Sequence, residues 1–534
     1  MSRILCLYAI VTDSLYGHAL LLCNAVLIGR MENKMQYNST RNNNIKVNSA
    51  MAIKQGLSEE GGLFVPESFP KVTLDEIESL SKKSYNERAY FVLSKFLTDF
   101  STEDLKNCIS NAYTKEKFGT DAIAPVYKFN DEVYFLELWH GPTCAFKDMA
   151  LQILPHFLTT SMKMTNEEKE IIILVATSGD TGKAALEGFK DVNGTRIIVF
   201  YPDNGVSEIQ KLQMVTQRGN NVSVAAVKGN FDDAQNGVKK IFTDNDYKAL
   251  LDRNGFKLSS ANSINWGRLV PQIVYYFSAY ADLLASGEIN IGDEINVVVP
   301  TGNFGNILAS YYAKKMGLPI KKFICASNEN NVLTDFIKTG IYDKTRQFHT
   351  TISPSMDILI SSNLERFLYD LSGRNDSLIS ELMTKLNTEG KYEIPDNIKT
   401  VMQELFDADC CDDKETMASI KKTFEDGKYV MDTHTSVGKC VYDKYVARTG
   451  DKTKTVIAST ASPFKFNQSV LIALEDYNYV AGKDEFELLD LLQEKSGLKI
   501  PSSLSELKDR TPIFDTVVEK DEMANTVSDF LKVE

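Results

Sequence analysis

A lysine in an apolar setting is the residue of this chain best placed for covalent chemistry. Lys147 lies in the run ELWHGPTCAFKDMALQ, residues 137–152, directly after Phe146 and ahead of an apolar stretch. Burial among such residues lowers the pKa of a lysine and supplies the neutral amine that forms a Schiff base with an aldehyde. The alternative is a surface lysine paired with Asp148, and the motif taken by itself favours that alternative.

A glycine- and hydroxyl-rich run, ATSGDTGKA at residues 176–184, is the first candidate binding loop. Its glycines leave backbone N–H groups at a helix start, where the helix dipole favours an anion, and the Ser178 and Thr181 hydroxyls add donors for a carboxylate or phosphate. It is not a Walker A loop, because the glycines are too close together and Ala184 follows the lysine. A plain turn capped by Asp180 or Ser178 explains the run equally well.

The run PTGNFGN, residues 300–306, is a stronger candidate for a phosphate cradle. It also lies between an apolar strand and a helix, and we expect Gly302 and Gly305 to adopt the positive φ angles that turn successive N–H groups inward. The chain has no GxGxxG motif here, so dinucleotide binding is disfavoured. A third run, STASP at residues 459–463, offers the Thr460 hydroxyl to a ring nitrogen, although read alone it is only a turn.

The segments that position these loops alternate between apolar strands and helices. Such alternation indicates an α/β fold with parallel sheets that helices cover on both faces, and ligands in such folds bind beyond the carboxyl ends of the strands. Residues 74–118 are expected to be helical, with Thr73 or Asp75 as the cap. Residues 377–426 are charged, and we interpret them as a solvated helical insertion or subdomain. The expected strands are residues 171–176, 196–202, 221–227, 295–300, 321–327 and 454–459.

Composition excludes several classes of protein. The chain has 534 residues, which suggests two or three domains, and 43% of them are hydrophobic, as in ordinary globular proteins. A net charge of −13 argues against a nucleic-acid partner, which needs clustered Lys and Arg. Eight cysteines without a CxxC pair and five histidines without a ligand spacing predict no metal site and no disulfide framework. We therefore expect a reducing, cytoplasmic compartment.

The first thirty residues differ from the rest. Residues 4–29 are mostly apolar, but three polar residues interrupt them, so neither piece reaches the roughly 20 apolar residues that a membrane span needs. No small-residue cleavage site follows, as a signal peptide requires. We interpret residues 1–30 as a non-native or disordered extension, with a membrane or signal role and a docked helix as alternatives. The interrupting residues are Asp13, His18 and Asn24.

Several of these runs, in this order, resemble threonine synthases, which are pyridoxal-phosphate enzymes of the tryptophan-synthase-β fold type (fold type II). The resemblance extends from about residue 35 to about residue 467 and rests on HGPTCAFKDMALQ, TSGDTG and PTGNFGN, with support from NSINWGR, SSNLER and DTHTSVG. It implies an N-terminal subdomain at residues 31–120, a two-lobed catalytic region at 121–480 that contains the 377–426 insertion, and a C-terminal helical segment at 481–534.

The resemblance also implies roles for individual residues. Lys147 matches the lysine that forms the Schiff base with pyridoxal 5'-phosphate, and Thr460 matches the hydroxyl residue that faces the pyridine nitrogen. The loop that holds the cofactor phosphate is matched by Gly302, Asn303, Phe304, Gly305 and Asn306. The loop that receives the substrate carboxylate is matched by Thr177, Ser178, Asp180 and Thr181. Weaker candidates for the substrate phosphate are Arg268, Ser361, Asn363 and Arg366, since an arginine fork binds two phosphate oxygens.

The activity that the resemblance implies is threonine synthase, which makes L-threonine and phosphate from O-phospho-L-homoserine and water, the last step of threonine biosynthesis. The alternatives are a phospho-lyase that releases 2-oxobutyrate, and a non-catalytic cofactor-binding homologue. The sequence departs from the family at Ser462, where a histidine is usual. His434 is interpreted either as a substrate contact or as a structural histidine, and Trp139 and Trp266 as core residues. We expect a monomer or homodimer with no membrane partner.

Overall fold

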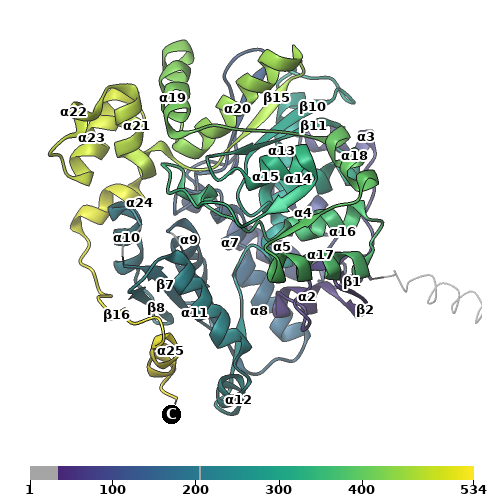
Figure 1. The fold of residues 1–534 in the computed structure, drawn as a ribbon, viewed down its shortest axis with the longest axis vertical. Helices are drawn as coiled ribbons and strands as arrows, with labels where there is room; N and C mark the ends of the chain where they lie inside the picture. The colour runs from purple at the N-terminus through teal and green to yellow at the C-terminus, as the bar shows by residue number, and fades with distance from the viewer. Residues whose placement is uncertain (1–33, 178, 204–205, 534) are drawn as a thin grey trace, which may run out of the picture.

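A computed structural model describes residues 34–177, 179–203 and 206–533 (Figure 1). The expectation for residues 1–30 and the assignment of Ser178 fall outside the described residues. Every helix among those described falls short of the length or the hydropathy that crossing a membrane requires. The same residues contain no grouping of three or more His, Cys, Asp or Glu side chains suited to a metal ion.

The larger sheet has six strands, in the order β14-β11-β10-β15-β5-β4, and all neighbours are parallel except β4 and β5. Its central strand, β10, is buried at every position because helices cover both faces of the sheet. The β-branched run INVVVP suits such a position, where side chains pack on both sides. The strands are β4 (Val126–Lys128), β5 (Val133–Glu137), β10 (Ile295–Pro300), β11 (Ile320–Ser327), β14 (Phe406–Cys410) and β15 (Thr455–Ser459).

The smaller sheet has five parallel strands in the order β16-β8-β7-β6-β9 and occupies the lower left of Figure 1. Its edge strand β16 comes from the C-terminal segment, so the end of the chain packs back onto this lobe. All six strands expected from the sequence are present in the two sheets within one residue of their expected bounds. The strands here are β6 (Glu170–Ala176), β7 (Thr195–Pro202), β8 (Val222–Val227), β9 (Phe256–Ser259) and β16 (Val517–Val518).

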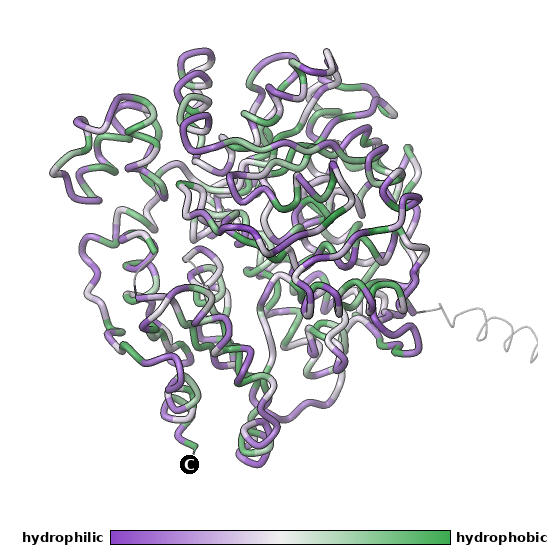
Figure 2. The backbone as a smooth tube through the Cα atoms, in the orientation of Figure 1, coloured by the Kyte–Doolittle hydropathy of each residue, from purple (hydrophilic) through white to green (hydrophobic). Residues whose placement is uncertain are grey.

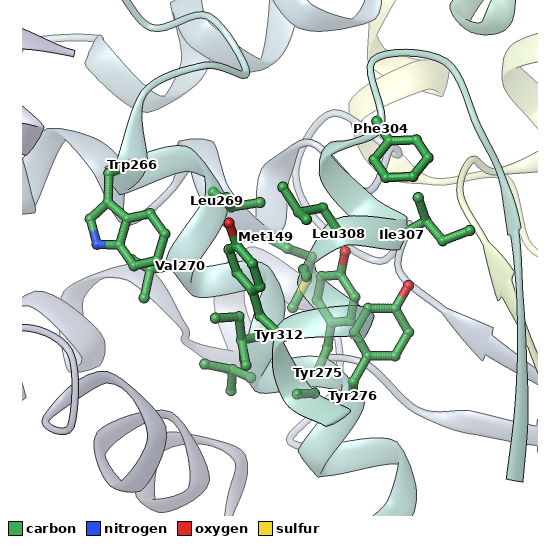
Figure 3. Packing of buried hydrophobic residues seen from close by; sticks show 14 of the residues in the cluster. Met149, Trp266, Leu269, Val270, Tyr275, Tyr276, Phe304, Ile307, Leu308 and Tyr312 are labelled. Carbon is green, nitrogen blue, oxygen red and sulfur yellow. The ribbon is translucent and has the colours of Figure 1, made fainter. Parts of the chain in front are cut away.

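The helix α13 (Trp266–Ala285) lies at the centre of the main hydrophobic core (Figure 3). Trp266 at its start is fully buried, with ring centroids 5.2 Å from Tyr37 and 5.7 Å from Phe96, so this tryptophan is a core residue. Figure 2 shows outer helices such as α12 (Asn245–Arg253) and α19 (Asp413–Gly427) as largely hydrophilic. The other helices of the two lobes are α7 (Asp148–Leu151), α8 (Leu154–Met164), α9 (Asp180–Phe189), α10 (Glu208–Val215), α11 (Phe231–Thr243), α14 (Gly305–Met316), α15 (Val332–Thr339), α16 (Leu364–Leu371) and α20 (Thr433–Thr449).

The N-terminal part forms a small antiparallel sheet in the order β2-β1-β3 with helices around it. Residues 74–118 are helical as expected and form four short helices. Thr73 caps the first, and its side chain and that of Glu76 each bond the other's backbone N–H. The elements are β1 (Tyr37–Ser39), β2 (Asn42–Val47), β3 (Phe64–Pro66), α2 (Ser49–Gln55), α3 (Leu74–Leu80), α4 (Tyr85–Leu93), α5 (Thr102–Ala112) and α6 (Lys115–Phe118).

The charged segment 377–426 is more than a solvated helical insertion, and this corrects the expectation. It contains β14, which pairs in parallel with β11 and forms one edge of the larger sheet. The remaining elements of this part and of the C-terminal segment are β12 (Ile341–Asp343), η1 (Pro354–Met356), α17 (Asp376–Thr388), β13 (Lys391–Glu393), α18 (Asp396–Leu405), η2 (Pro463–Phe466), α21 (Asn467–Leu474), α22 (Tyr477–Val480), α23 (Glu485–Ser496), α24 (Ser502–Ser505), η3 (Glu506–Asp509) and α25 (Met523–Leu531).

Candidate active site

Lys147 lies in the loop after β5, immediately before α7, and is only 9% exposed. Its Nζ donates a hydrogen bond to Ser355 Oγ at 3.1 Å and lies 3.6 Å from Asp180 Oδ2. Asp148 is not its partner, because that carboxylate accepts hydrogen bonds from the backbone N–H and the hydroxyl of Thr143. The interpretation of Lys147 as a surface lysine paired with Asp148 is therefore wrong.

Asp180 brings a second lysine to the site. Lys465 of η2, whose side chain is fully buried, places Nζ 2.5 Å from Asp180 Oδ1 and donates to the carbonyl of Thr143 at 3.0 Å. Gln210 Nε2 also donates to Asp180 Oδ1, at 2.9 Å. Asp180 belongs to the lobe of the smaller sheet and Lys465 to that of the larger sheet, so this ion pair joins the two lobes at the site.

Burial favours a neutral amine on Lys147, and the neighbouring charges act in both directions. Burial lowers the pKa of Lys147 and is the largest effect; Asp180 opposes it, whereas the positive charges of Lys465 and Arg268 lower the pKa further. Burial alone would raise the pKa of Asp180, but the charges of Lys465 and Lys147 outweigh burial and hold that pKa well below its usual range. The carboxylate is therefore ionised, and the amine beside it loses its proton more easily than an ordinary lysine does.

The 302–306 loop connects β10 to α14 and leaves its backbone donors available. Among the described residues, no hydrogen bond occupies the N–H groups of residues 302–306, and no side chain caps α14. The positive φ angle falls on Phe304, at 60°, and not on Gly302 or Gly305, which corrects the expectation. Gly302 is required for another reason: a Cβ there would lie 2.8 Å from the carbonyl oxygen of Ser355.

Two of the four residues proposed from the sequence for the substrate phosphate, Ser361 and Asn363, contact this loop. Ser361 Oγ donates to the carbonyl of Gly302 at 2.7 Å, and both Nδ2 and the backbone N–H of Asn363 donate to the carbonyl of Asn303. Arg366 is fully buried, and each of its nitrogens donates to the protein. Its acceptors are the carbonyls of Phe64 and Ile264 and the side chain of Asn363.

Asn306, in the first turn of α14, has an unused donor. Its Oδ1 accepts hydrogen bonds from the hydroxyls of Tyr275, at 2.8 Å, and Tyr276, both of α13 (Figure 3). Its Nδ2 is buried and has no hydrogen-bond partner in the part of the chain that is described. Buried amide donors are normally satisfied, so an unpartnered one beside unpaired backbone N–H groups fits an anionic ligand. The loop therefore fits the phosphate of pyridoxal phosphate.

Thr460 is almost fully buried at the end of β15, the neighbour of both β10 and β5. Its carbonyl accepts a hydrogen bond from the backbone N–H of Phe146 at 2.8 Å, and Ala145 pairs with Ala461 in an isolated antiparallel bridge. The candidate residue for the ring nitrogen is thus fixed directly to the segment that carries Lys147. Ser462, which replaces the usual histidine, is fully buried, and its Oγ lacks a partner among the described residues.

The side chain of Thr177 satisfies part of the loop before α9. Thr177 Oγ1 accepts hydrogen bonds from the backbone N–H groups of Gly179, at 3.0 Å, and Gly182, at 2.9 Å. Thr181, the next candidate for the substrate carboxylate, is half-buried in the first turn of the helix. Arg268 is buried near Lys147 and donates from Nη1 to the carbonyl of Ala261, and burial lowers the pKa of its guanidinium to about 10. Its Nε has no partner within the described chain.

His434 contacts the loop that carries Ser355. The backbone N–H of Ser355 donates to His434 Nε2 at 3.1 Å, so the other nitrogen, Nδ1, carries the proton and faces Asp432 Oδ1 at 2.9 Å. This arrangement occupies both ring nitrogens, as the structural interpretation of His434 requires. Sequence reasoning did not identify Ser355, Lys465 or Gln210 as site residues. A lysine among the apolar residues of SPFKF was the one available signal, and nothing in the sequence distinguished the other two.

Two protein-family models match the chain. "Threonine synthase N terminus" matches residues 36–113, and "Pyridoxal-phosphate dependent enzyme" matches residues 122–390. The chain is 44% identical over 435 residues to threonine synthase-like 1 of Homo sapiens, an alignment that covers 79% of this chain and 58% of that protein. The chain thus spans less than two thirds of the length of that relative.

Two further proteins are similar over nearly their whole length. The threonine synthase of Pseudomonas aeruginosa is 39% identical over 437 residues, which cover 82% of this chain and 90% of that one. The crystal structure of a PLP-bound threonine synthase from Brucella melitensis superimposes with a TM-score of 0.82 at 34% identity, covering 93% of this chain and 99% of that chain.

Proposed function

We propose that this chain, which belongs to the threonine synthase family of pyridoxal-phosphate-dependent enzymes, converts O-phospho-L-homoserine and water to L-threonine and phosphate. One juxtaposition carries the proposal. A buried lysine whose pKa is lowered follows β5, and a loop with unpaired backbone N–H groups follows β10, two strands away in the same sheet. Pyridoxal phosphate needs an amine that reacts with its aldehyde and a set of N–H donors that binds its phosphate. These two features provide both.

The residues present fit this cofactor. When bound, pyridoxal phosphate supplies an aldehyde and an electron-withdrawing ring that makes the substrate Cα–H bond more acidic. We assign its phosphate to the N–H groups of residues 302–306 and to Asn306 Nδ2, and its aldehyde to Lys147 Nζ. We assign its ring nitrogen to the hydroxyl of Thr460, a neutral partner that would leave that nitrogen largely unprotonated.

Lys147 is the proposed base. In its neutral form, Nζ takes the proton from the substrate Cα, and a second proton loss at Cβ lets phosphate leave from Cγ. Cγ then gains a proton, water adds its hydroxyl to Cβ, and Cα regains its proton to give threonine. Ser355 Oγ and Asp180, which contact Nζ, orient the amine between these transfers. Burial of the amine also excludes bulk water from the proton that it carries.

The substrate residues are proposed from the sequence motifs and from the contacts of Arg268. We propose that Arg268, with its unpartnered Nε, contributes to binding the substrate phosphate. Ser361 and Asn363 act through the 302–306 loop that they hold, and Arg366 acts through Asn363. We propose Thr181 and Ser178 for the substrate carboxylate. Thr177 supports them as the cap of the helix, and Asp180 faces the lysines.

A second activity has one specific observation in its favour. Ser462 lies where the family usually has a histidine, so the fate of the substrate after phosphate leaves can differ from that in threonine synthases. A phospho-lyase would release 2-oxobutyrate, ammonia and phosphate from the same substrate and one water. Both activities use Lys147 and the phosphate loop, so only the product separates them.

Incubation of the cofactor-loaded full chain with O-phospho-L-homoserine tests the proposal. Phosphate is measured colorimetrically, and the organic product is identified by mass spectrometry. Threonine and phosphate in equal amounts support threonine synthase. 2-Oxobutyrate with phosphate supports the lyase, and no phosphate release at all rejects both.

Lys147→Ala tests the role of the amine. We expect borohydride to trap no cofactor on the variant and turnover to fall at least about 1000-fold, since both the attachment point and the base are lost. The control is Lys248→Ala, which removes an exposed lysine of α12 and leaves trapping and turnover unchanged. A Lys147→Ala protein that keeps wild-type turnover contradicts the assignment.

A further inference from the structure

We propose that Lys465 is a positioning residue: by pairing with Asp180, it keeps that carboxylate from holding a proton on Lys147, so the amine of Lys147 stays neutral. The inference rests on the proposed role of Lys147 as the cofactor-binding lysine. Neither the family descriptions nor the named relatives assign a role to Lys465.

The distances favour Lys465 as the partner of Asp180. The Nζ of Lys465 lies 2.5 Å from Asp180 Oδ1, whereas the Nζ of Lys147 lies 3.6 Å from Oδ2. Lys465 is also fixed by the carbonyl of Thr143, four residues before Lys147. Gln210 donates to the same carboxylate oxygen as Lys465 and holds the carboxylate in place from α10.

The charges at the site leave room for one lysine proton, not two. Asp180, Lys465 and Arg268 are the charged groups that face Lys147, and Asp148, whose pKa is raised to about 6 by burial, faces Lys465 from α7. If both lysines were protonated at neutral pH, two ammonium groups and a guanidinium would share two carboxylates, those of Asp180 and Asp148, in a buried space. Such an excess of positive charge is costly, and loss of the proton from the more weakly paired lysine relieves it.

The consequence concerns the capture of the cofactor. Only an unprotonated amine attacks an aldehyde, so the rate of capture at neutral pH depends on the neutral fraction of Lys147. If Lys465 lost its charge, Asp180 would pair with Lys147 and hold its proton. The neutral fraction of Lys147 at pH 7 would then fall about tenfold for each unit by which the pKa of Lys147 rises.

The test compares full-length chains freed of cofactor: wild type, Lys465→Met, Lys465→Arg and the double variant Asp180→Asn/Lys465→Met. Pyridoxal phosphate is added between pH 6 and pH 10, and the rate of the absorbance change is recorded. Borohydride trapping and peptide mass spectrometry confirm attachment at Lys147. Circular dichroism and a thermal melt verify that each variant is folded.

The rate of cofactor capture should rise with pH, and the pH at which it reaches half of its maximum is the midpoint. We expect this midpoint to lie at least one pH unit higher for Lys465→Met than for the wild type. Its capture is then at least tenfold slower at pH 7 and nearly equal at pH 10. Lys465→Arg keeps the wild-type midpoint because it keeps the charge, and the double variant returns toward it because no carboxylate remains to hold the proton. A Lys465→Met midpoint equal to that of the wild type overturns the proposal, as does a rate reduced by the same factor at every pH or a double variant that stays shifted.

A second measurement uses the wild-type chain alone, so it remains informative even if Lys465→Met fails to fold. Trace acetylation across the same pH range, with exposed Lys248 as the internal standard, reports the reactivity of each lysine. Because the pKa of Lys147 is lowered, we expect Lys147 to become reactive at a lower pH than an exposed lysine does, and reactivity that rises only at the pH of an exposed lysine or above it overturns the proposal. Wild-type protein that traps no cofactor on Lys147 instead contradicts the proposed function, while the acetylation profile still reports whether the amine of Lys147 is neutral.

Discussion

Two loops of this molecule each connect a strand to a helix, but they differ in whether their backbone N–H groups are hydrogen-bonded. The 177–182 loop follows β6 and starts α9, and the 302–306 loop follows β10 and starts α14. In the first, the hydroxyl of Thr177 occupies the N–H groups of Gly179 and Gly182. In the second, none of the described residues occupies the N–H groups of residues 302–306.

The difference shows how a helix start that a side chain partly caps differs from one that leaves its backbone donors open to the cofactor phosphate. Both loops contain glycines, so glycine content does not separate them. The capped loop has a glycine in the left-handed region, Gly179 with φ of 131°, whereas the open loop has the bulky Phe304 there, with φ of 60°. Strain of this kind needs support, and Phe304 packs its ring against Phe367 and Phe406. Rigid packing thus holds the open donors in place for a ligand.

The largest expected effect comes from placing a charge in the open loop. Asn306→Asp keeps the acceptor for Tyr275 and Tyr276 but replaces the Nδ2 donor by a negative oxygen. We expect cofactor affinity, measured by titration of absorbance, to fall at least about 30-fold, since like charges a few ångströms apart repel by several kcal/mol. The stability of the cofactor-free chain should not fall, because a negative charge suits a helix N-terminus.

The control for this variant is Asn387→Asp, which makes the same charge change on the exposed surface of α17. It should leave cofactor affinity unchanged. If Asn306→Asp binds the cofactor as tightly as the control does, the phosphate does not lie at this loop, and the contrast between the two loops has no functional meaning.

The next effect comes from crowding the same loop. A Cβ at Gly302 would meet the carbonyl oxygen of Ser355 at 2.8 Å, so Gly302→Ala must displace the loop or the segment that carries Ser355. We expect cofactor affinity to fall roughly tenfold, as for other overpacked sites. Gly438→Ala adds the same methyl group at a buried glycine where the nearest atoms lie 3.4 Å away, and it should change affinity little. Equal affinities for the two variants contradict the prediction.

A change in the capped loop should affect stability instead of binding. Thr177→Ala removes the acceptor for two backbone N–H groups, and we expect the free energy of unfolding in urea to fall by about 1 kcal/mol. Thr177→Ser keeps the oxygen and should lose less. Cofactor affinity should stay within about threefold of wild type. A Thr177→Ala protein with full stability and weakened cofactor binding would reverse the assignments of the two loops.

The smallest expected effect is binding of inorganic phosphate to the cofactor-free chain. At a concentration three times its dissociation constant, phosphate should stabilise the folded chain by about 0.8 kcal/mol, seen as a rise in Tm. The same phosphate should slow capture of the cofactor by competition. Asn306→Asp should show neither effect, and a rise in its Tm equal to that of the wild type places phosphate elsewhere.

The sequence predicted six of the eleven strands of the two sheets, those whose signals were local. An apolar β-branched run such as IIILVA needs no partner to be recognised as a strand. β14 was missed because FDADC alternates charged and small residues at the edge of the sheet, where one side faces solvent. The positive φ angle was assigned to glycines because propensity favours them, whereas tertiary packing places it on Phe304.

Contacts between residues that lie far apart in the chain could not be predicted from the sequence. The threonine synthase motifs led to Lys147, but its partners lie further along the chain: Ser355 in η1, 208 residues on, and Asp180 at the start of α9, 33 residues on. Lys465 and Asp180 meet only because the two lobes close on each other. Arg366 matched a phosphate-binding role by type, yet burial commits its guanidinium to backbone carbonyls and to Asn363.

The order of strands in the larger sheet has a consequence for how the chain is made. β5, which precedes Lys147, has β15 as its parallel neighbour, and Val133 lies opposite Thr455 in the register. During synthesis on a ribosome, β5 emerges on the order of half a minute before β15 does. Until then the nascent β5 has an unpaired edge and the lysine has no enclosed pocket, so this interval is when a chaperone would be needed most.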